Sequence, residues 1–481
     1  MDNEFYLAQQ HVLKQKKNIK SIYFYRICGT GMGGAAALLK QAGYLIAGCD
    51  STYYPPMSTY LESLDVPLEN LDEVTDERLR EFDLIVVGNV VDGKSKDARR
   101  IEGLGVKFCS FPAAIGALVL QEKHVIGIAG THGKTTTTYL CKQLFNSLGH
   151  DVGYFIGGVI SDQPSAYLGD SDYFFIESDE YDSAYFEKFS KFHQYNLKSM
   201  ILTSLEFDHA DIFTDVEAIK DEFRKVIPTL SRNFIVNADY PEALELVREK
   251  LASNVQKLVP YGQASNNGPQ IIDAGEERTK FFARFGEKET LFTSNLAGRH
   301  NLSNLTAAMI FASAEGASPE QVQDHIMKMK LPKRRQEVRG EYKGMKIIDD
   351  YAHHPTAIQL TLESLEQLYP EKKQVVIYEP HSATARSGIF TKDYIHAFRR
   401  VEKLFLTKIH RKTTAIGKKT LVLDSIIQGL DKRGVDSQIV TSLDEIIAGI
   451  EEKADEDSIL IVMSNGTCLG LWESDFVKSL G

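Results

Sequence analysis

The chain has 481 residues, of which 43% are hydrophobic and 25% charged, a composition typical of a globular protein. At roughly 150 residues per domain, its length predicts about three domains. The formal net charge of −11 argues against a general binder of nucleic acid or membrane surfaces, so we expect single basic residues to serve local anion sites.

The five cysteines are dispersed and form no C-x-x-C pair, which indicates reduced thiols in the cytoplasm. The first residues contain no apolar segment of a signal peptide, and no apolar run approaches the about 18 residues that cross a membrane. The sequence predicts a soluble cytoplasmic protein. It carries no signal for an oligomeric state.

The first third of the chain begins with an apolar strand over residues 22–27, followed by a glycine-rich loop and a helix rich in Ala and Leu. Further strands are predicted to end at Asp50 and to cover residues 84–91. Because strands alternate with helices, we expect a parallel, doubly wound sheet.

The first glycine loop matches the pattern G-x-G-x-x-G, and Asp50 stands 21 residues after Gly29, where an NAD-binding fold places its ribose-binding acid. Glycines and a helix N-terminus also let backbone N–H groups approach any other diphosphate. NAD, a UDP-sugar and a ligand-free turn therefore remain open at this point. The loop consists of Gly29, Thr30, Gly31, Met32, Gly33 and Gly34.

A second unit begins near residue 123 with a buried strand, a loop and a helix. The loop ends as a phosphate-binding loop does, although Ile128 replaces the first glycine of the usual pattern G-x-x-x-x-G-K-[ST]. We expect Lys134, as an exposed loop lysine, to meet phosphate oxygens, and the Thr135 hydroxyl to meet Mg²⁺. The loop residues are Gly130, Thr131, His132, Gly133, Lys134, Thr135 and Thr136.

Acidic runs follow two later strands, which are predicted over residues 173–178 and 199–205. The first run holds Glu177 and Asp179, and the second holds Glu206, Asp208 and His209. Because functional groups gather at the carboxyl ends of parallel strands, these runs predict a metal site. Two solvated turns would give the same pattern.

A further strand is expected over residues 233–239, and residues 252–297 form a polar, less regular segment that suggests a small antiparallel excursion before a helix near residue 300. A third unit starts around residue 334, with strands at 346–352, 374–380, 403–409 and 458–464. The fold class is therefore α/β, with three successive units.

Seven motifs occur in order along the chain: GTHGKTTTT, IESDEYDSAYF, SLEFDHAD, GRHNLSN, KRRQEV, DDYAHHPTA and MSNG. Together they resemble the Mur ligases of bacterial cell-wall synthesis, whose phosphate loop, G-T-x-G-K-[ST], lacks the early glycine. The resemblance implies a UDP-binding Rossmann-like domain (1–122), a central P-loop ATPase domain (123–333) and a C-terminal Rossmann-like domain (334–481).

The implied activity is amide-bond formation that uses ATP and Mg²⁺ and proceeds through an acyl phosphate. The implied substrates are UDP-N-acetylmuramate and an amino acid or small peptide, with no nucleic-acid or membrane partner. The resemblance assigns the first glycine loop to the UDP-sugar. The implied UDP-sugar residues are Gly29, Thr30, Gly31, Met32, Gly33, Asp50, Ser51 and Ser58.

The resemblance also assigns site residues. The catalytic set is Lys134, Glu177, His209, Arg335 and His354, of which Glu177 and His209, with Thr135, would hold the metal. Besides the phosphate loop, the ATP site takes in His300, Asn301, Asn304, Arg335 and Asp350. His353 and Arg386 would contact the peptide. Without a ligand, His209 would be structural, Asn301 a helix cap, and His353 and His354 an exposed loop pair.

The stretches CDSTYYPPMSTYLESL and ESDEYDSAYFEKFSKF are most similar to the members that attach the tripeptide L-Ala-γ-D-Glu-meso-diaminopimelate in peptidoglycan recycling. Addition of free L-alanine is the alternative, and an NAD-dependent oxidoreductase or a nucleotide-binding switch is the alternative from another class. One departure concerns residues 92–98, DGKSKDA, where the family leads us to expect a sequence like SRGNPE. Contacts from that loop to the UDP-sugar are therefore in doubt.

Overall fold

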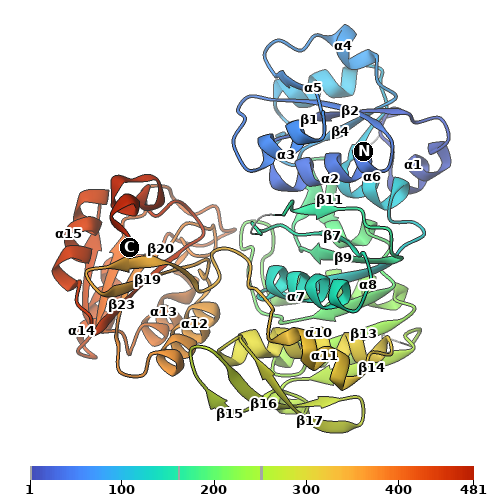
Figure 1. The fold of residues 1–481 in the computed structure, drawn as a ribbon. Coiled ribbons are helices and arrows are strands. Elements are labelled where there is room, and N and C mark those ends of the chain that lie inside the picture. Colours follow the sequence, from blue (N-terminus) through green and yellow to red (C-terminus); the bar gives the residue numbers. More distant parts are fainter. Residues whose placement is uncertain (1–2, 161–162, 250–252) are drawn as a thin grey trace. The chain divides into compact units, whose positions relative to one another are not determined.

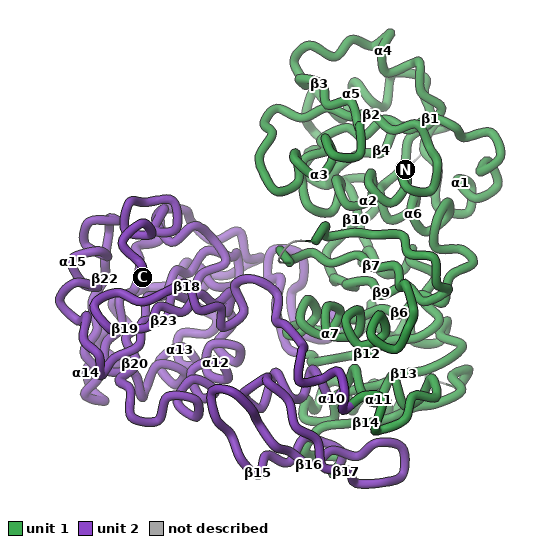
Figure 2. The backbone as a smooth tube through the Cα atoms, in the orientation of Figure 1, with its two compact units in different colours: residues 1–205, 220–266, 307–322 green, residues 206–219, 267–306, 323–481 purple. Residues whose placement is uncertain are grey.

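The computed structural model describes residues 3–160, 163–249 and 253–481. The chain forms two compact units, which Figure 2 colours separately. The first comprises residues 1–205, 220–266 and 307–322, and the second comprises residues 206–219, 267–306 and 323–481. Among the described residues, none of the helices is long and apolar enough to cross a bilayer.

The first unit contains a five-stranded parallel sheet in the order β3-β2-β1-β4-β5 (Figure 1), as expected for a Rossmann-like domain. The strand order reverses between β1 and β4, and ligands bind open α/β sheets at such a switch point. The strands are β1 (Ser21–Tyr25), β2 (Leu45–Asp50), β3 (Leu68–Asn70), β4 (Leu84–Val87) and β5 (Phe108–Ser110). The helices are α1 (Gln9–Gln15), α2 (Thr30–Gln41), α3 (Met57–Ser63), α4 (Asp76–Arg80), α5 (Lys96–Gly103) and α6 (Phe111–Leu118).

A seven-stranded sheet follows in the same unit, in the order β14-β13-β12-β6-β9-β7-β8, and β8 alone among these strands pairs antiparallel. Its strands are β6 (His124–Ala129), β7 (Gly153–Phe155), β8 (Ala166–Tyr167), β9 (Tyr173–Ser178), β12 (Ser199–Leu202), β13 (Asn233–Asn237) and β14 (Lys257–Tyr261). A hairpin, β10 (Asp182–Ala184) with β11 (Glu187–Ser190), lies outside it. In this sheet β6 lies between β9 and β12. The phosphate loop follows β6, and the two acidic runs are at or after the ends of β9 and β12.

The remaining helices near this sheet in sequence are α7 (Lys134–Ser147), α8 (Val216–Val226), α9 (Pro241–Arg248), α10 (Arg299–Ala314) and α11 (Pro319–Ile326). The predicted antiparallel excursion is confirmed, because β15 (Gln270–Ala274), β16 (Thr279–Phe285) and β17 (Lys288–Ser294) form an antiparallel sheet in the second unit. Residue 252, where this segment was expected to start, lies outside the described residues.

The second unit also holds a six-stranded sheet, β18-β19-β23-β20-β21-β22, in which β18 alone of the six pairs antiparallel. The strands are β18 (Glu337–Tyr342), β19 (Met345–Asp350), β20 (Lys373–Glu379), β21 (Lys403–Thr407), β22 (Asp436–Val440) and β23 (Ser458–Ser464). The helices are α12 (Pro355–Leu368), α13 (Thr391–Ala397), α14 (Leu423–Asp431) and α15 (Leu443–Lys453). The strands β18 and β22 were not predicted from the sequence.

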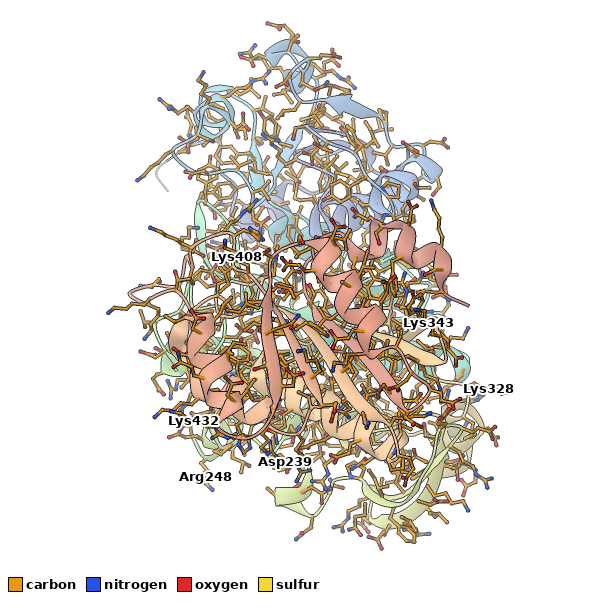
Figure 3. All side chains as sticks on the ribbon, turned by 90° about the vertical axis from the view of Figure 1, so that its left-hand side faces the viewer. Asp239, Arg248, Lys328, Lys343, Lys408 and Lys432 are labelled. Carbon is orange, nitrogen blue, oxygen red and sulfur yellow. The ribbon has the colours of Figure 1, made fainter. Side chains whose placement is uncertain are left out.

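Apolar clusters fill both faces of the six-stranded sheet, so β23 is buried along its whole length. All five cysteines are buried and free. Charged side chains such as Lys343, Lys408 and Lys432 stay exposed (Figure 3). This division between apolar interior and charged surface is the one that the composition predicts.

Candidate functional site

The phosphate loop connects β6 to α7 through two glycines in left-handed or related conformations. Gly130 has a φ of 126°, and a Cβ there would lie 2.5 Å from the carbonyl oxygen of Ser204. Gly133 has a φ of 80° and stands directly before the first residue of α7. Both positions therefore need glycine, whereas Ile128 lies inside β6 and is fully buried. The missing first glycine does not disturb the loop.

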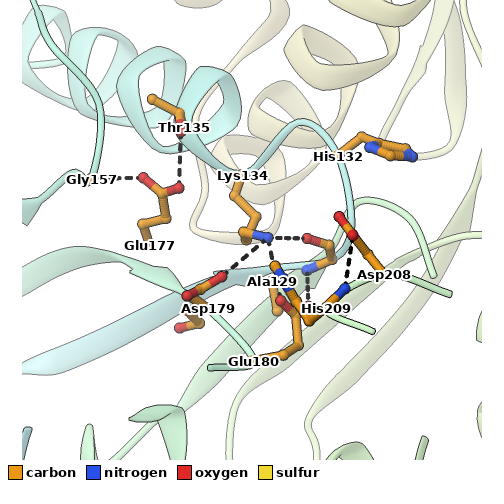
Figure 4. Close-up of polar contacts among 12 residues, drawn as sticks. Ala129, His132, Lys134, Thr135, Gly157, Glu177, Asp179, Glu180, Asp208 and His209 are labelled. Atoms are coloured by element: carbon orange, nitrogen blue, oxygen red, sulfur yellow. Dashed lines mark hydrogen bonds and ion pairs between the residues drawn. The ribbon is translucent and has the colours of Figure 1, made fainter. Parts of the chain in front are cut away.

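Lys134 is largely buried, with 11% of its side chain exposed, which corrects the expectation of an exposed loop lysine. Its ammonium donates to the carbonyl of Gly130 at 2.6 Å and lies 3.3 Å from Glu180 and 3.5 Å from Asp179 (Figure 4). The second oxygen of the Glu180 carboxylate accepts a hydrogen bond from the N–H of Gly130 at 3.2 Å. The two carboxylates hold the lysine over the phosphate loop.

Two predicted metal ligands meet in the first unit. The Thr135 hydroxyl donates to Oε1 of Glu177 at 2.9 Å, and the N–H of Gly157 donates to Oε2 at 2.7 Å (Figure 4). Gly158 leaves room for this pair, because a Cβ there would lie 2.6 Å from Cγ2 of Thr135. Hydroxyl and carboxylate oxygens are ligands that Mg²⁺ prefers, so these residues fit the ion.

His209, the third predicted metal ligand, belongs to the second unit and has a φ of 54°. Its N–H donates to Oδ1 of the preceding Asp208 at 2.7 Å (Figure 4). Burial raises the pKa of Asp208, but His209, the imidazoles of His353 and His354, and the Thr384 hydroxyl together lower it far below its ordinary value. Asp208 therefore stays ionised among three histidines.

His353 and His354 are more ordered than an exposed loop pair. His354 is buried and caps α12, because its Nδ1 accepts the N–H of Thr356 at 3.3 Å. The carbonyl of His353 accepts hydrogen bonds from the hydroxyls of Tyr378 and Tyr394 at 2.9 and 3.1 Å. The loop between β19 and α12 is therefore fixed by the cap of α12 and by two tyrosine hydroxyls from neighbouring elements.

The two arginines of the KRRQEV motif have different surroundings. Arg334 donates to the carbonyl of Gly466 at 3.1 Å and lies 3.4 Å from Asp349, so it joins the ends of two strands. Arg335 lies over the ring of Tyr351, 4.8 Å from its centroid. An acid thus holds Arg334, whereas Arg335, the predicted γ-phosphate contact, stacks on an aromatic ring.

Asp350, the predicted ribose contact, is buried, and its two carboxylate oxygens accept the N–H groups of Gln336 and Ala352, each at 2.8 Å. Burial raises its pKa, and the charge of Arg335 opposes that rise. In this structure Asp350 fixes the loop that carries Arg335.

The predicted adenine-side residues lie at the start of α10, beside the same loop. Burial, and next the charge of Arg335, lower the pKa of His300 to about 4. Asn301 donates to the carbonyl of Ala297 at 3.0 Å and to the side chain of Gln336 at 3.2 Å. Asn301 lies inside the helix and donates through its amide, so it is not a helix cap. Asn304 is buried one turn later.

In the predicted UDP-sugar loop, Gly29 stands before α2 and the loop glycines lie close to neighbouring side chains. A Cβ on Gly33 would lie 2.2 Å from the sulfur of Met57, the residue before the buried Ser58. The carboxylate of Asp50 accepts the N–H groups of Cys28 at 2.9 Å and Ser51 at 2.8 Å. Asp50 therefore fixes the turn after β1 and the turn after β2.

Arg386, the weaker candidate for a peptide contact, is half-buried, and its guanidinium donates to the carbonyl of His381 at 2.8 Å.

The predicted residues divide between the units: Lys134, Thr135 and Glu177 belong to the first, and His209, Arg335 and His354 to the second. Glu180 was not predicted as the partner of Lys134, because it occurs in the sequence only as one letter of the motif IESDEYDSAYF. The EYD letters directly after Asp179 were the available signal.

Three family descriptions match successive parts of the chain. Residues 21–123 match "Mur ligase family, catalytic domain", residues 128–312 match "Mur ligase middle domain", and residues 334–466 match "Mur ligase, glutamate ligase domain". The chain is 32% identical over 460 residues to the UDP-N-acetylmuramate–L-alanyl-γ-D-glutamyl-meso-2,6-diaminoheptandioate ligase of Haemophilus influenzae, covering 94% of this chain and 98% of the relative.

A UDP-N-acetylmuramate–L-alanine ligase of Lactobacillus delbrueckii is 31% identical over 394 residues, covering 81% of this chain and 85% of the relative. Among solved structures, a murein peptide ligase from Psychrobacter arcticus has a TM-score of 0.66 at 29% identity, covering 94% of this chain and 97% of that chain. The similarity therefore extends over nearly the whole chain.

Proposed function

Because the chain belongs to the Mur ligase family and is thus an ATP-dependent ligase that forms C–N bonds, we propose that it joins L-Ala-γ-D-Glu-meso-diaminopimelate to UDP-N-acetylmuramate. One observation carries this assignment: 32% identity to a ligase named for these substrates, over 98% of that relative. The enzyme would act in the cytoplasm in peptidoglycan recycling. Its domains would be residues 1–122, 123–333 and 334–481.

In the proposed reaction, a carboxylate oxygen of the muramyl group attacks the γ-phosphorus of ATP and ADP leaves. The amine of the tripeptide then attacks the acyl carbon, phosphate leaves, and the nitrogen loses a proton. The physical problem is that two anions must meet, so cations have to offset the developing charge.

Lys134 is the residue best placed to do so in the first unit. It follows the glycine-rich loop at the start of α7, where the helix N-terminus also favours anions. In this structure Glu180 and Asp179 neutralise the ammonium. When ATP binds, phosphate oxygens would take the place of these carboxylates as its partners. In the second unit, Arg335 would contact the γ-phosphate, and His300, Asn301 and Asn304 the adenine side.

Thr135 and Glu177 would hold Mg²⁺, together with His209 as the family resemblance implies. The hydroxyl and the carboxylate already converge at 2.9 Å. The bound ion supplies positive charge to phosphate oxygens. Glu177 is kept in orientation by the N–H of Gly157, so its second oxygen stays fixed.

The acceptor is the part of the proposal that a second relative contests, since an L-alanine ligase is 31% identical to the chain. The tripeptide carries three carboxylates and alanine one, so a site lined with cations for the tripeptide would leave them unpaired with alanine. His353 and Arg386 are the residues that we propose for peptide contacts.

The test is to incubate the enzyme with ATP, Mg²⁺ and UDP-N-acetylmuramate, offering the tripeptide or L-alanine, and to identify the product by mass. We expect a kcat/KM at least about 100-fold higher for the tripeptide. The dipeptide L-Ala-γ-D-Glu is the matched control for the diaminopimelate carboxylates. A higher kcat/KM for L-alanine would make the chain an alanine-adding enzyme, and no amine-dependent ADP release at all would refute the ligase assignment.

A further inference from the structure

Arg26 has an unusual backbone conformation directly after β1. Its φ is 71°, a left-handed conformation that is strained for a residue with a Cβ. The N–H of Arg26 donates to the carbonyl of Cys49 at 2.9 Å, which holds the turn in place. Gly88, after β4, leaves room for it, since a Cβ there would lie 3.2 Å from that of Arg26. Backbone strain of this kind concentrates at functional sites.

The guanidinium of Arg26 lies at the point where the strand order of the first sheet reverses. It donates to the hydroxyl of Ser51 at 2.8 Å and to the carboxylate of Asp97 at 3.1 Å, and it lies 3.7 Å from Asp50. Asp50 and Ser51 stand at the end of β2, and Asp97 in the first turn of α5. Hydrogen bonds to Ser51 and Asp97 use two N–H groups of a guanidinium, which carries further donors.

The neighbouring glycine loop, residues 29–34, contains no lysine or arginine, so it offers a diphosphate backbone N–H groups, the Thr30 hydroxyl and the N-terminus of α2, but no cationic side chain. Asp50 adds a negative charge beside that loop. The 92–98 loop departs from the expected SRGNPE-like sequence and contributes Asp97 to the ion pair. Arg26, which contacts Ser51 and Asp50 at the end of β2, therefore places a positive charge beside the glycine loop.

We propose that Arg26 binds the diphosphate of the UDP-sugar and supplies contacts that residues 92–98 do not. The inference rests on the proposed function, because it assumes a UDP-linked substrate. Ser51 acts as the positioning residue, whose hydroxyl holds the guanidinium beside the glycine loop. A guanidinium suits this role because its planar donors match phosphate oxygens.

The test uses Arg26→Gly, because glycine adopts a φ of 71° without strain while the guanidinium is lost. In calorimetric titrations we expect the variant to bind UDP-N-acetylmuramate, and UDP alone, about 10- to 100-fold more weakly. The KM for ATP should not change, nor should kcat at saturating UDP-N-acetylmuramate. The melting temperature should not fall.

Asp97→Asn is the matched control, because it breaks the same ion pair and keeps the guanidinium. It should bind UDP as tightly as the wild type, within about threefold. If both variants lost affinity equally, Arg26 would only connect β1 to α5, and the inference would be wrong. Unchanged UDP binding by Arg26→Gly would also overturn it, while ligation by that variant would leave the proposed function intact. A wild type that ligates without binding any UDP-sugar would refute both.

Discussion

The carboxylate of Glu180 contacts both the side chain of Lys134 and the backbone of the phosphate loop. One of its oxygens lies 3.3 Å from the Lys134 ammonium, and the other accepts the N–H of Gly130 at 3.2 Å. Glu180 is almost fully buried, with 3% of its side chain exposed. A single acid therefore fixes the shape of the loop and offsets the charge that is predicted to meet ATP.

We predict that Lys134→Ala lowers kcat for ADP release by about 100- to 1,000-fold, because the phosphate charge is no longer offset. The same change also lowers the melting temperature, since the buried Glu180 carboxylate loses its contact to the Lys134 ammonium. Assays of ADP release measure the effect on kcat, and thermal unfolding measures the effect on the melting temperature. The double variant with Glu180→Gln should recover the melting temperature and stay inactive. Near-normal turnover in folded Lys134→Ala would contradict the ATP site.

For the metal site, we predict that Thr135→Ala raises the Mg²⁺ concentration needed for half-maximal ADP release by about tenfold, because an oxygen ligand is lost. Thr135→Ser keeps the hydroxyl that contacts Glu177 at 2.9 Å, so it should respond to Mg²⁺ like the wild type. Titration of both variants with MgCl₂ gives the comparison. Equal Mg²⁺ dependence of the alanine and serine variants would argue against Thr135 as a ligand.

A third prediction concerns pH. Burial, then the charge of Arg335, lowers the pKa of His300 to about 4, from an ordinary value of about 6.5. Between these values the unfolded chain binds more protons at this residue, so the stability that neutral His300 provides is lost as the pH falls from about 6.5 towards 4. Gln does not titrate. The melting temperature of His300→Gln, measured relative to that of the wild type, should therefore rise as the pH is lowered from 7 to 5. A difference that stays constant between these pH values would show that His300 does not titrate in this way.

The fourth prediction compares two glycines of positive φ around α7. Alanine at Gly149 (φ 94°) meets nothing within 4 Å, so Gly149→Ala should cost about 1–2 kcal/mol of unfolding free energy, from backbone strain alone. Gly130→Ala adds a Cβ 2.5 Å from the Ser204 carbonyl, so it should lower the unfolding free energy by more than Gly149→Ala does. It should also weaken ATP binding. Urea unfolding of both variants provides the measurement. A smaller loss at Gly130 than at Gly149 would mean that the loop relaxes freely.

Strands built on a continuous apolar run were the most predictable part of the fold. Residues 173–178 and 458–464 form strands with the predicted bounds, because they contain the runs YFFI and ILIVM in the interior of largely parallel sheets. The strand predicted over 84–91 ends at Val87, because residues 88–91 form a turn in which the N–H of Val91 donates to the carbonyl of Gly88 at 3.2 Å. The sequence of β22, DSQIV, has too few apolar residues to be recognised, and its pairing with β21 defines it as a strand.

The predicted site residues depended on motifs, and motifs do not reveal which partner each side chain has. Nothing in the letters GKTT shows that Lys134 is largely buried against Glu180, because that contact joins residues 46 apart in the chain. The conformation of Arg26 was equally invisible, since an arginine after a strand gives no sign of a positive φ. Both facts follow from tertiary contacts.

The five buried cysteines can report on the unfolding of this enzyme, because they become accessible to thiol reagents only when the chain around them opens. Burial raises the pKa of Cys141 and of Cys468, so neither thiol reacts until its surroundings open. Cys141 lies in the first unit and Cys468 in the second. Pulsed alkylation with mass-spectrometric mapping of these two peptides would therefore tell which unit loses its structure first, with no engineered probe.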